Sequence, residues 1–217
     1  MIEQVDTQKA IESRQWFIVR RWQTYSSELR TLLLRVAAVV VLYACQLGHH
    51  LSLASEARQA NLAFHQVATI AAVLLVVVSL LDLLLVLKRI LPVWLPFLMT
   101  VIDLVAIALV VAKAGGPMAT SLTGAFYLVV AMAGLRFDLR LVWLATLGAM
   151  AAYMGTVGAV DDSWFDSQHA VPVVQQAVAL ACLGGTGLVV GQVVRLARSL
   201  AEQYRQRMDM VQAEETK

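Results

Sequence analysis

The sequence has few of the residues and motifs from which a catalytic centre or a disulfide framework is built. Only two of its 217 residues are cysteines, Cys45 and Cys182. Both lie inside apolar runs, which excludes a disulfide-rich secreted domain. The chain has no phosphate-binding glycine loop, no nucleophile elbow and no HExxH motif. No cleavable signal peptide precedes the first apolar run. We therefore expect no enzymatic reaction within these residues, and no nucleic-acid partner.

Apolar residues are abundant instead. They make up 59% of the chain, compared with roughly 45–50% in a soluble domain. They gather in runs about 20 residues long, the length of helix that crosses a bilayer. The sequence predicts an all-α polytopic membrane protein, a six-transmembrane-helix bundle in contact with the lipid bilayer. The predicted spans are 31–51, 65–87, 93–113, 119–135, 141–159 and 171–194.

The segments that flank this membrane domain, residues 31–194, are polar. In residues 1–30, Ile11, Ile18 and Trp22 recur at heptad-like spacing, which predicts an amphipathic helix lying in the headgroup region. The alternative is a solvated helix that simply continues into the first span. Residues 195–217 keep a loose three–four spacing of apolar residues. This spacing predicts a C-terminal cytoplasmic signalling helix, a coiled-coil connector to an effector domain outside this sequence.

The basic residues are distributed unequally between the two ends of the predicted spans. Of the 17 lysines and arginines, all but Arg35, Arg58 and Lys113 lie in the two flanking segments or in the second–third and fourth–fifth loops. Since cytoplasmic loops carry the excess of positive charge, both termini are predicted to be cytoplasmic. An even number of spans agrees with this orientation. The expected location is a bacterial inner membrane, crossed several times.

The four histidines are all predicted at the opposite, outer end of the spans. His49 and His50 end the first span, His65 opens the second and His169 precedes the sixth. Imidazole is the commonest side-chain metal ligand, and thiolate or carboxylate groups complete many zinc and copper sites. The predicted metal- or ligand-binding cluster therefore has eight members: His49, His50, His65, His169, Asp161, Asp162, Asp166 and Cys45. A b-type haem with axial histidines is a second hypothesis, and interfacial histidines without a ligand are a third.

Three charged residues are predicted inside the membrane. Arg35 and Asp82 both lie roughly 7–9 Å from the inner side, by the rise of 1.5 Å per residue. They are expected to form an intramembrane charge pair. Asp103 is deeper, roughly 15 Å in by the same rise, and has no cation at its depth. It is predicted to be a buried carboxylate, acting either in a proton relay or in structural hydrogen bonding.

Span six contains a small-xxx-small pattern, Gly187-Leu-Val-Val-Gly191. Two glycines at this spacing allow the backbones of two helices to approach closely. The pattern predicts a homodimer seam directly above the connector helix. Packing against another span of the same chain is the alternative.

Two stretches resemble a known membrane module. The segment Leu34-Arg-Val-Ala-Ala-Val-Val-Val-Leu-Tyr-Ala-Cys-Gln-Leu-Gly-His-His50 resembles the first span of the six-helix membrane anchors of bacterial class III adenylate cyclases. Gly134-Leu-Arg-Phe-Asp-Leu-Arg140 is similar to the opening of their fifth span. Similar modules precede sensor histidine kinases, including quorum sensors. The resemblance covers most of residues 30–210.

This resemblance implies a homodimer whose sixth helices lead into a cytoplasmic catalytic domain that makes cAMP. Some related anchors are dihaem cytochromes. We therefore interpret the chain as the receptor or anchor domain of a signalling enzyme in signal transduction. It would sense a small ligand or metal ion at the outer cluster and relay it through span six. The alternatives are a haem redox sensor or electron-transfer cytochrome, a small proton-coupled transporter, and an anchor that only dimerises its effector.

Overall fold

The chain is helical throughout the part that the structure describes. The computed structural model describes residues 2–88, 90, 92–118, 120–160 and 171–215, with side chains from residue 25 onward except at 60, 205, 209 and 211–215. The elements in chain order are α1 (Ile2–Ser52), α2 (Ser55–Ala60), α3 (Leu62–Leu87), α4 (Leu95–Lys113), the 3₁₀ turn η1 (Ser121–Thr123), α5 (Gly124–Gly134), α6 (Leu139–Val160) and α7 (Val173–Glu215). The all-α prediction is confirmed.

Five of the described helical segments are long and apolar enough to cross a membrane: Tyr25–Ser52, Leu62–Leu87, Leu95–Lys113, Leu139–Val160 and Val173–Met208. The predicted fourth span, 119–135, corresponds to the shorter apolar segment Ser121–Gly134. Its α-helical part, α5, has 11 residues and is therefore about 16 Å long, against the roughly 30 Å of a bilayer core. The described residues thus form five helices of membrane length and one apolar helix of about half that length.

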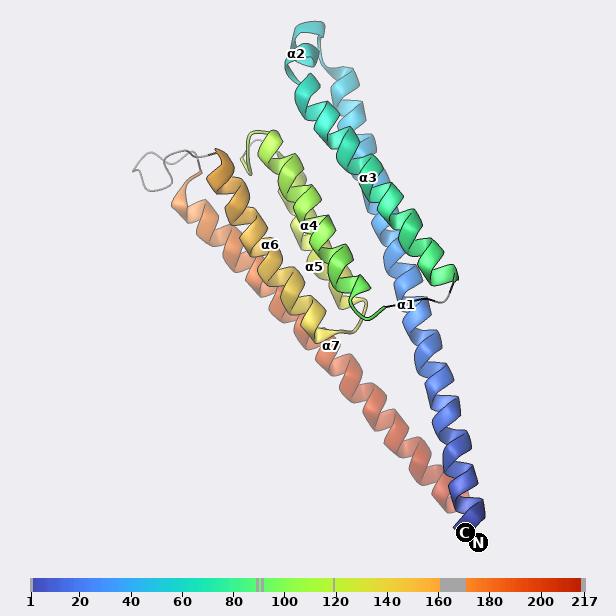
Figure 1. Ribbon diagram of the computed structural model, residues 1–217. Helices are drawn as coiled ribbons and strands as arrows, with labels where there is room; N and C mark the ends of the chain where they lie inside the picture. Colours follow the sequence, from blue (N-terminus) through green and yellow to red (C-terminus); the bar gives the residue numbers. More distant parts are fainter. Residues whose placement is uncertain (1, 89, 91, 119, 161–170, 216–217) are drawn as a thin grey trace.

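The helices form two parts (Figure 1). The hairpin consists of α1 and α3, joined by α2, and the body consists of α4, α5, α6 and α7. The main hydrophobic core belongs to the body alone, because every residue of that cluster lies between Phe97 and Val194. In Figure 1 the end of the hairpin near α2 diverges from the body. We call this end outer and the opposite end inner, after the predicted orientation.

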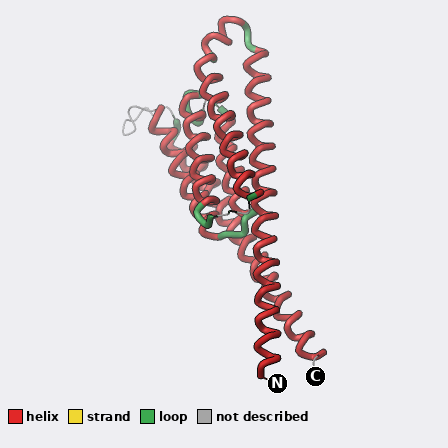
Figure 2. Tube along the Cα trace, turned by 45° about the vertical axis from the view of Figure 1, so that its right-hand side comes forward, coloured by secondary structure: helices red, strands yellow, loops and turns green. Residues whose placement is uncertain are grey.

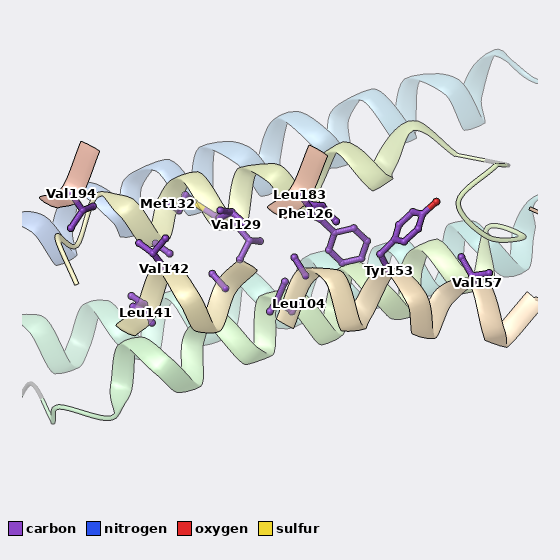
Figure 3. Packing of buried hydrophobic residues seen from close by; sticks show 14 of the residues in the cluster. Leu104, Phe126, Val129, Met132, Leu141, Val142, Tyr153, Val157, Leu183 and Val194 are labelled. Atoms are coloured by element: carbon purple, nitrogen blue, oxygen red, sulfur yellow. The ribbon is translucent and has the colours of Figure 1, made fainter. Parts of the chain in front are cut away.

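The short helix α5 is the centre of the body. Phe126 and Val130 are fully buried, and α6 contributes the fully buried Ala145 and Ala149. Figure 3 shows Phe126 beside Leu183 of α7, with Tyr153 of α6 next along the same row. Because α4, α6 and α7 pack around α5, six of its apolar side chains are buried, while Leu128 is 39% exposed.

The turns of the body follow from a few residues. Gly115 and Gly116, which precede Pro117, take left-handed φ values of 93° and 92°, which glycine adopts without steric cost. At the other end, the backbone N–H of Arg140 donates to the Asp138 carboxylate (3.0 Å), which satisfies a free donor of the first turn of α6. Phe137 has a φ of 52°, and its carbonyl accepts from the guanidinium of Arg198 (2.8 Å). The α5–α6 turn is thereby attached to α7.

Both ends of the chain extend from the same end of the bundle as helix (Figures 1 and 2). The predicted interfacial helix over residues 1–30 is not a separate element, because α1 runs without a break from Ile2 to Ser52. The position of this helix in the headgroup region stays a prediction. Likewise α7 continues as helix for 43 residues, past Val194, the last residue of the buried core.

Candidate functional site

The outer end of the hairpin holds two of the four histidines together. His50 lies in the last turn of α1 and His65 near the start of α3. Their rings are stacked, with centroids 4.0 Å apart and an interplanar angle of 3°. Tyr43 continues this row, 6.4 Å from His65 between ring centroids. Its hydroxyl is hydrogen-bonded to that of Thr69 (3.1 Å). These contacts connect α1 to α3 and so make the hairpin a unit.

The rest of the predicted outer cluster is not assembled in the described residues. His49 is exposed, and Cys45 is also exposed, whereas His50 is 8% exposed. His169, Asp161, Asp162 and Asp166 lie outside the described residues. Within the searched, described part of the chain, no three His, Cys, Asp or Glu side chains are grouped so that they could hold a metal ion.

The geometry of the histidine pair suits neither proposed cofactor. A metal ion binds imidazole in the plane of the ring, along the nitrogen lone pair. Two rings stacked face to face at 4.0 Å direct their lone pairs side by side, so one ion cannot lie in both planes. Haem iron is held between axial imidazoles that meet end to end across the metal. As they stand, His50 and His65 do not fit a shared zinc, copper or haem site.

A second polar group lies at the inner end, where the hairpin meets the body. Arg35 of α1 forms an ion pair with Asp103 of α4 at 2.6 Å, and a second guanidinium N–H of Arg35 donates to the sulfur of Met99 (3.3 Å). The predicted pair of Arg35 with Asp82 is therefore corrected, as is the prediction that Asp103 lacks a cation. Counting along the helices placed Asp82 level with Arg35 and Asp103 deeper, whereas the packing of the helices brings Asp103 into contact with Arg35.

A second ion pair was missed by the sequence reasoning. Glu28 of α1 meets Arg136, in the α5–α6 turn, at 2.9 Å. Arg136 also donates to the carbonyl of Pro96 at the start of α4 (3.1 Å). Glu28 precedes Arg35 by seven residues, so both lie on one face of α1. That spacing is the signal that could have identified Glu28.

Asp82 of α3 completes what we call the inner cluster: Glu28, Arg35, Asp82, Asp103 and Arg136. Asp82 is 2% exposed. It lines a cavity of about 10 Å³ together with Arg35, Asp103, Arg136, Thr31 and Thr100, whereas Glu28 lies outside the lining. Its Oδ1 atom is buried and has no hydrogen-bond partner among the described residues. Formally the inner cluster has three carboxyl groups and two guanidinium groups.

Between the two polar ends, the hairpin and the body line an open apolar cavity of about 90 Å³. Tyr43 and Gln46 of α1, Ala72 of α3, Ile107 of α4 and Ala125 of α5 are among its lining residues. The amide nitrogen of Gln46 is buried without a partner in the described chain. The outer half of this interface is therefore loosely filled, whereas the inner end is closed by charged contacts.

The predicted dimer seam is occupied within the chain. Gly187 and Gly191 of α7 are both buried. A Cβ atom added to Gly187 would overlap Thr146 of α6, and one on Gly191 would lie 3.5 Å from Leu139. The Gly-xxx-Gly pattern thus allows α7 to approach α6 of the same chain, which was the alternative interpretation.

Comparisons with known proteins add no family to this description. No family model, curated protein or solved structure matches the chain. The resemblance to cyclase anchors therefore rests on the two sequence stretches that carry it.

Proposed function

We propose that this chain is the membrane receptor or anchor domain of a bacterial signalling enzyme, with an adenylate cyclase as the expected effector. It would lie in the inner membrane with both termini cytoplasmic, and α5 would complete a six-helix membrane domain. The observation that carries the proposal is the continuity of α7, which leaves the buried core at Val194 and stays helical to Glu215. A stiff helix of this kind can pass a rotation or shift in the membrane to a domain attached beyond it.

The exposed face of α7 supports a homodimer of this domain. Val189, Val193, Leu196 and Leu200 are 65%, 60%, 61% and 46% exposed. Their spacing of four, three and four residues is that of the seam of a two-stranded coiled coil. This stripe replaces Gly187 and Gly191 as the proposed seam. It runs from the membrane-spanning part of α7 into the polar part, so one interface would serve both.

The ligand-dependent part of the proposal places the stimulus at the outer half of the hairpin–body interface. A ligand shifts the equilibrium between two packings only when it binds one of them better. The cavity beside Tyr43 and Gln46 and the diverging hairpin tip (Figure 1) are where the two parts are least tightly packed. Differential binding there would change the angle of α1 and α3 relative to the body.

The test is a chimera in which α7 leads in register into a class III cyclase catalytic domain, expressed in bacteria that lack their own cyclase. Inserting two residues after Arg198 rotates the following helix by about 200°, while seven residues rotate it by nearly two full turns. We expect the two-residue insertion to lower cAMP output strongly and the seven-residue insertion to preserve it. The same two insertions between Ser52 and Ala54, in the outer turn, are the matched control. Equal output from both α7 insertions would contradict transmission through this helix.

A further inference from the structure

The inner cluster is the polar joint between the two parts of the molecule. Both ion pairs of the described chain join the hairpin to the body: Arg35 to Asp103 and Glu28 to Arg136. Arg35 also donates to Met99 of α4 at this joint. At the other end of the hairpin, the Tyr43–Thr69 hydrogen bond and the capping of the Leu51 and Leu53 carbonyls by Arg58 stay within the hairpin. Any change in the angle between hairpin and body therefore has to act on the inner cluster.

The charges of this joint do not balance. Glu28 and Arg35 reach it from α1, Asp82 from α3, Asp103 from α4 and Arg136 from the α5–α6 turn. No other charged side chain lines the cavity. With every group ionised, the cluster carries one net negative charge inside a low-dielectric bundle, which is unfavourable unless a further cation neutralises it.

The excess charge falls on Asp82. The other two carboxyl groups each have a guanidinium partner, at 2.6 Å for Asp103 and 2.9 Å for Glu28. Asp82 has no ion pair or hydrogen bond in the part of the chain that is described, and its Oδ1 is buried without a donor. A buried carboxylate with no donor is a costly arrangement, whereas a carboxylic acid needs only an acceptor for its proton.

A cation that neutralises the excess negative charge of the inner cluster has to be small. The cavity of about 10 Å³ has room for about one water molecule. Two guanidinium groups line it and repel a metal cation by their own positive charge. The hydroxyls of Thr31 and Thr100, which already donate to the carbonyls of Ser27 and Pro96, offer their remaining lone pairs as acceptors. These features favour a proton over a sodium ion.

We propose that the inner cluster binds one exchangeable proton on Asp82 and that this proton controls the angle between the hairpin and the body. In the closed arrangement seen here the carboxylic acid is neutral and the two ion pairs hold α1 against α4 and the α5–α6 turn. When the proton leaves to water on the inner side, the Asp82 carboxylate competes with Asp103 for Arg35 and requires water. The joint then loosens and the outer end of the hairpin moves. This inference does not depend on the proposed signalling role.

The two native cysteines provide the measurement. Cys45 lies on α1 of the hairpin and Cys182 on α7 of the body, and both are exposed. Spin labels on these two thiols, in the full chain reconstituted in lipid nanodiscs, report the hairpin–body distance by pulsed electron resonance without any engineered cysteine. We expect the distance distribution to shift between two populations as the pH is raised, with the steepness of a single proton. Asp82→Asn should hold the low-pH population at every pH, and Glu202→Gln, a change at an exposed residue, should leave the shift intact.

Infrared spectroscopy identifies the proton itself. We expect a carbonyl band of a protonated carboxylic acid that is present at low pH, lost as the distance shifts, and absent from Asp82→Asn. A band that persists in this variant, or a distance shift that survives in it, would overturn the assignment to Asp82. A distance that follows sodium concentration at fixed pH would replace the proton by a metal ion. Failure of Asp82→Asn to fold would also count against the proposal, since asparagine reproduces the neutral side chain.

Discussion

The ion pair between Arg35 and Asp103 gives the sharpest prediction about stability. Both side chains are nearly buried, with side-chain exposures of 5% and 12%. Replacing one partner of a buried pair costs about 3–5 kcal/mol, because the other charge is left uncompensated. The two single replacements are not equivalent here, because the inner cluster holds one more acid than base.

Arg35→Met leaves three carboxyl groups with Arg136 alone. An aspartate left without a cationic partner can become neutral by binding a proton, and at pH 7 protonating an ordinary aspartate costs about 4 kcal/mol. We therefore expect this variant to lose about 3–4 kcal/mol of unfolding free energy. Asp103→Asn leaves Arg35 beside Asp82, which lines the same cavity and can replace the lost partner. Its expected loss is about 1–2 kcal/mol, the scale of one weakened charged hydrogen bond.

The assay is reversible unfolding by sodium dodecyl sulfate in mixed micelles, followed by tryptophan fluorescence. In the double variant, Arg35→Met with Asp103→Asn, the loss should be smaller than the sum of the single losses by at least about 2 kcal/mol, since the partners interact directly. Arg195→Met, at an exposed position, should change stability by less than about 0.5 kcal/mol. Equal losses from the two single variants, or additive losses in the double variant, would refute the reasoning.

Three further predictions follow from local geometry. Gly187→Ala should destabilise the bundle by about 1–3 kcal/mol, because the added methyl group overlaps Thr146. Gly185→Ala, where the added methyl group has nothing within 4 Å, should instead stabilise the helix by up to about 1 kcal/mol through its higher helix propensity. The same unfolding assay compares the two variants, and equal effects would place Gly187 on a free face of α7. Phe137→Gly should raise stability by up to about 1 kcal/mol, because φ is 52° at this residue, and a loss in that assay would show that the ring itself stabilises the turn. Elemental analysis of the purified protein should find less than one zinc, copper or iron per chain held by His50 and His65, and near-stoichiometric metal lost on His50→Ala would contradict the stacked geometry.

The apolar runs along the sequence were sufficient to predict the helices and the positions of most of their ends. Apolar runs close to the thickness of a bilayer predict spans because every backbone polar group in lipid must be paired within the helix. Gly115 and Gly116 take left-handed φ values in the turn after α4, which agrees with the break between the predicted spans 93–113 and 119–135. The predicted span 119–135 corresponds to the shorter apolar segment Ser121–Gly134, and its position in the centre of the body depends on the three helices that pack around it.

The sequence did not predict which residues the charged side chains and the glycines contact. Depth in the membrane can be counted along a helix, and the count placed Arg35 level with Asp82 but Asp103 deeper, whereas the structure pairs Arg35 with Asp103. Which carboxylate meets the guanidinium depends on how α3 and α4 are rotated about their own axes, and rotation leaves no trace in a residue count. The same limit explains Gly187, since close approach to α6 and close approach to a second chain require the same glycine spacing.

By itself, then, the sequence determined an all-helical chain of membrane-length segments, the positions of its turns and the presence of charge inside it, because backbone pairing and hydrophobic length act locally. Only the tertiary structure decided that the chain divides into a hairpin and a body, that Arg35 pairs with Asp103, that His50 stacks on His65 and that Asp82 is left without a partner. These depend on the packing of whole helices against one another, where a rotation of one helix by a fraction of a turn exchanges one partner for another.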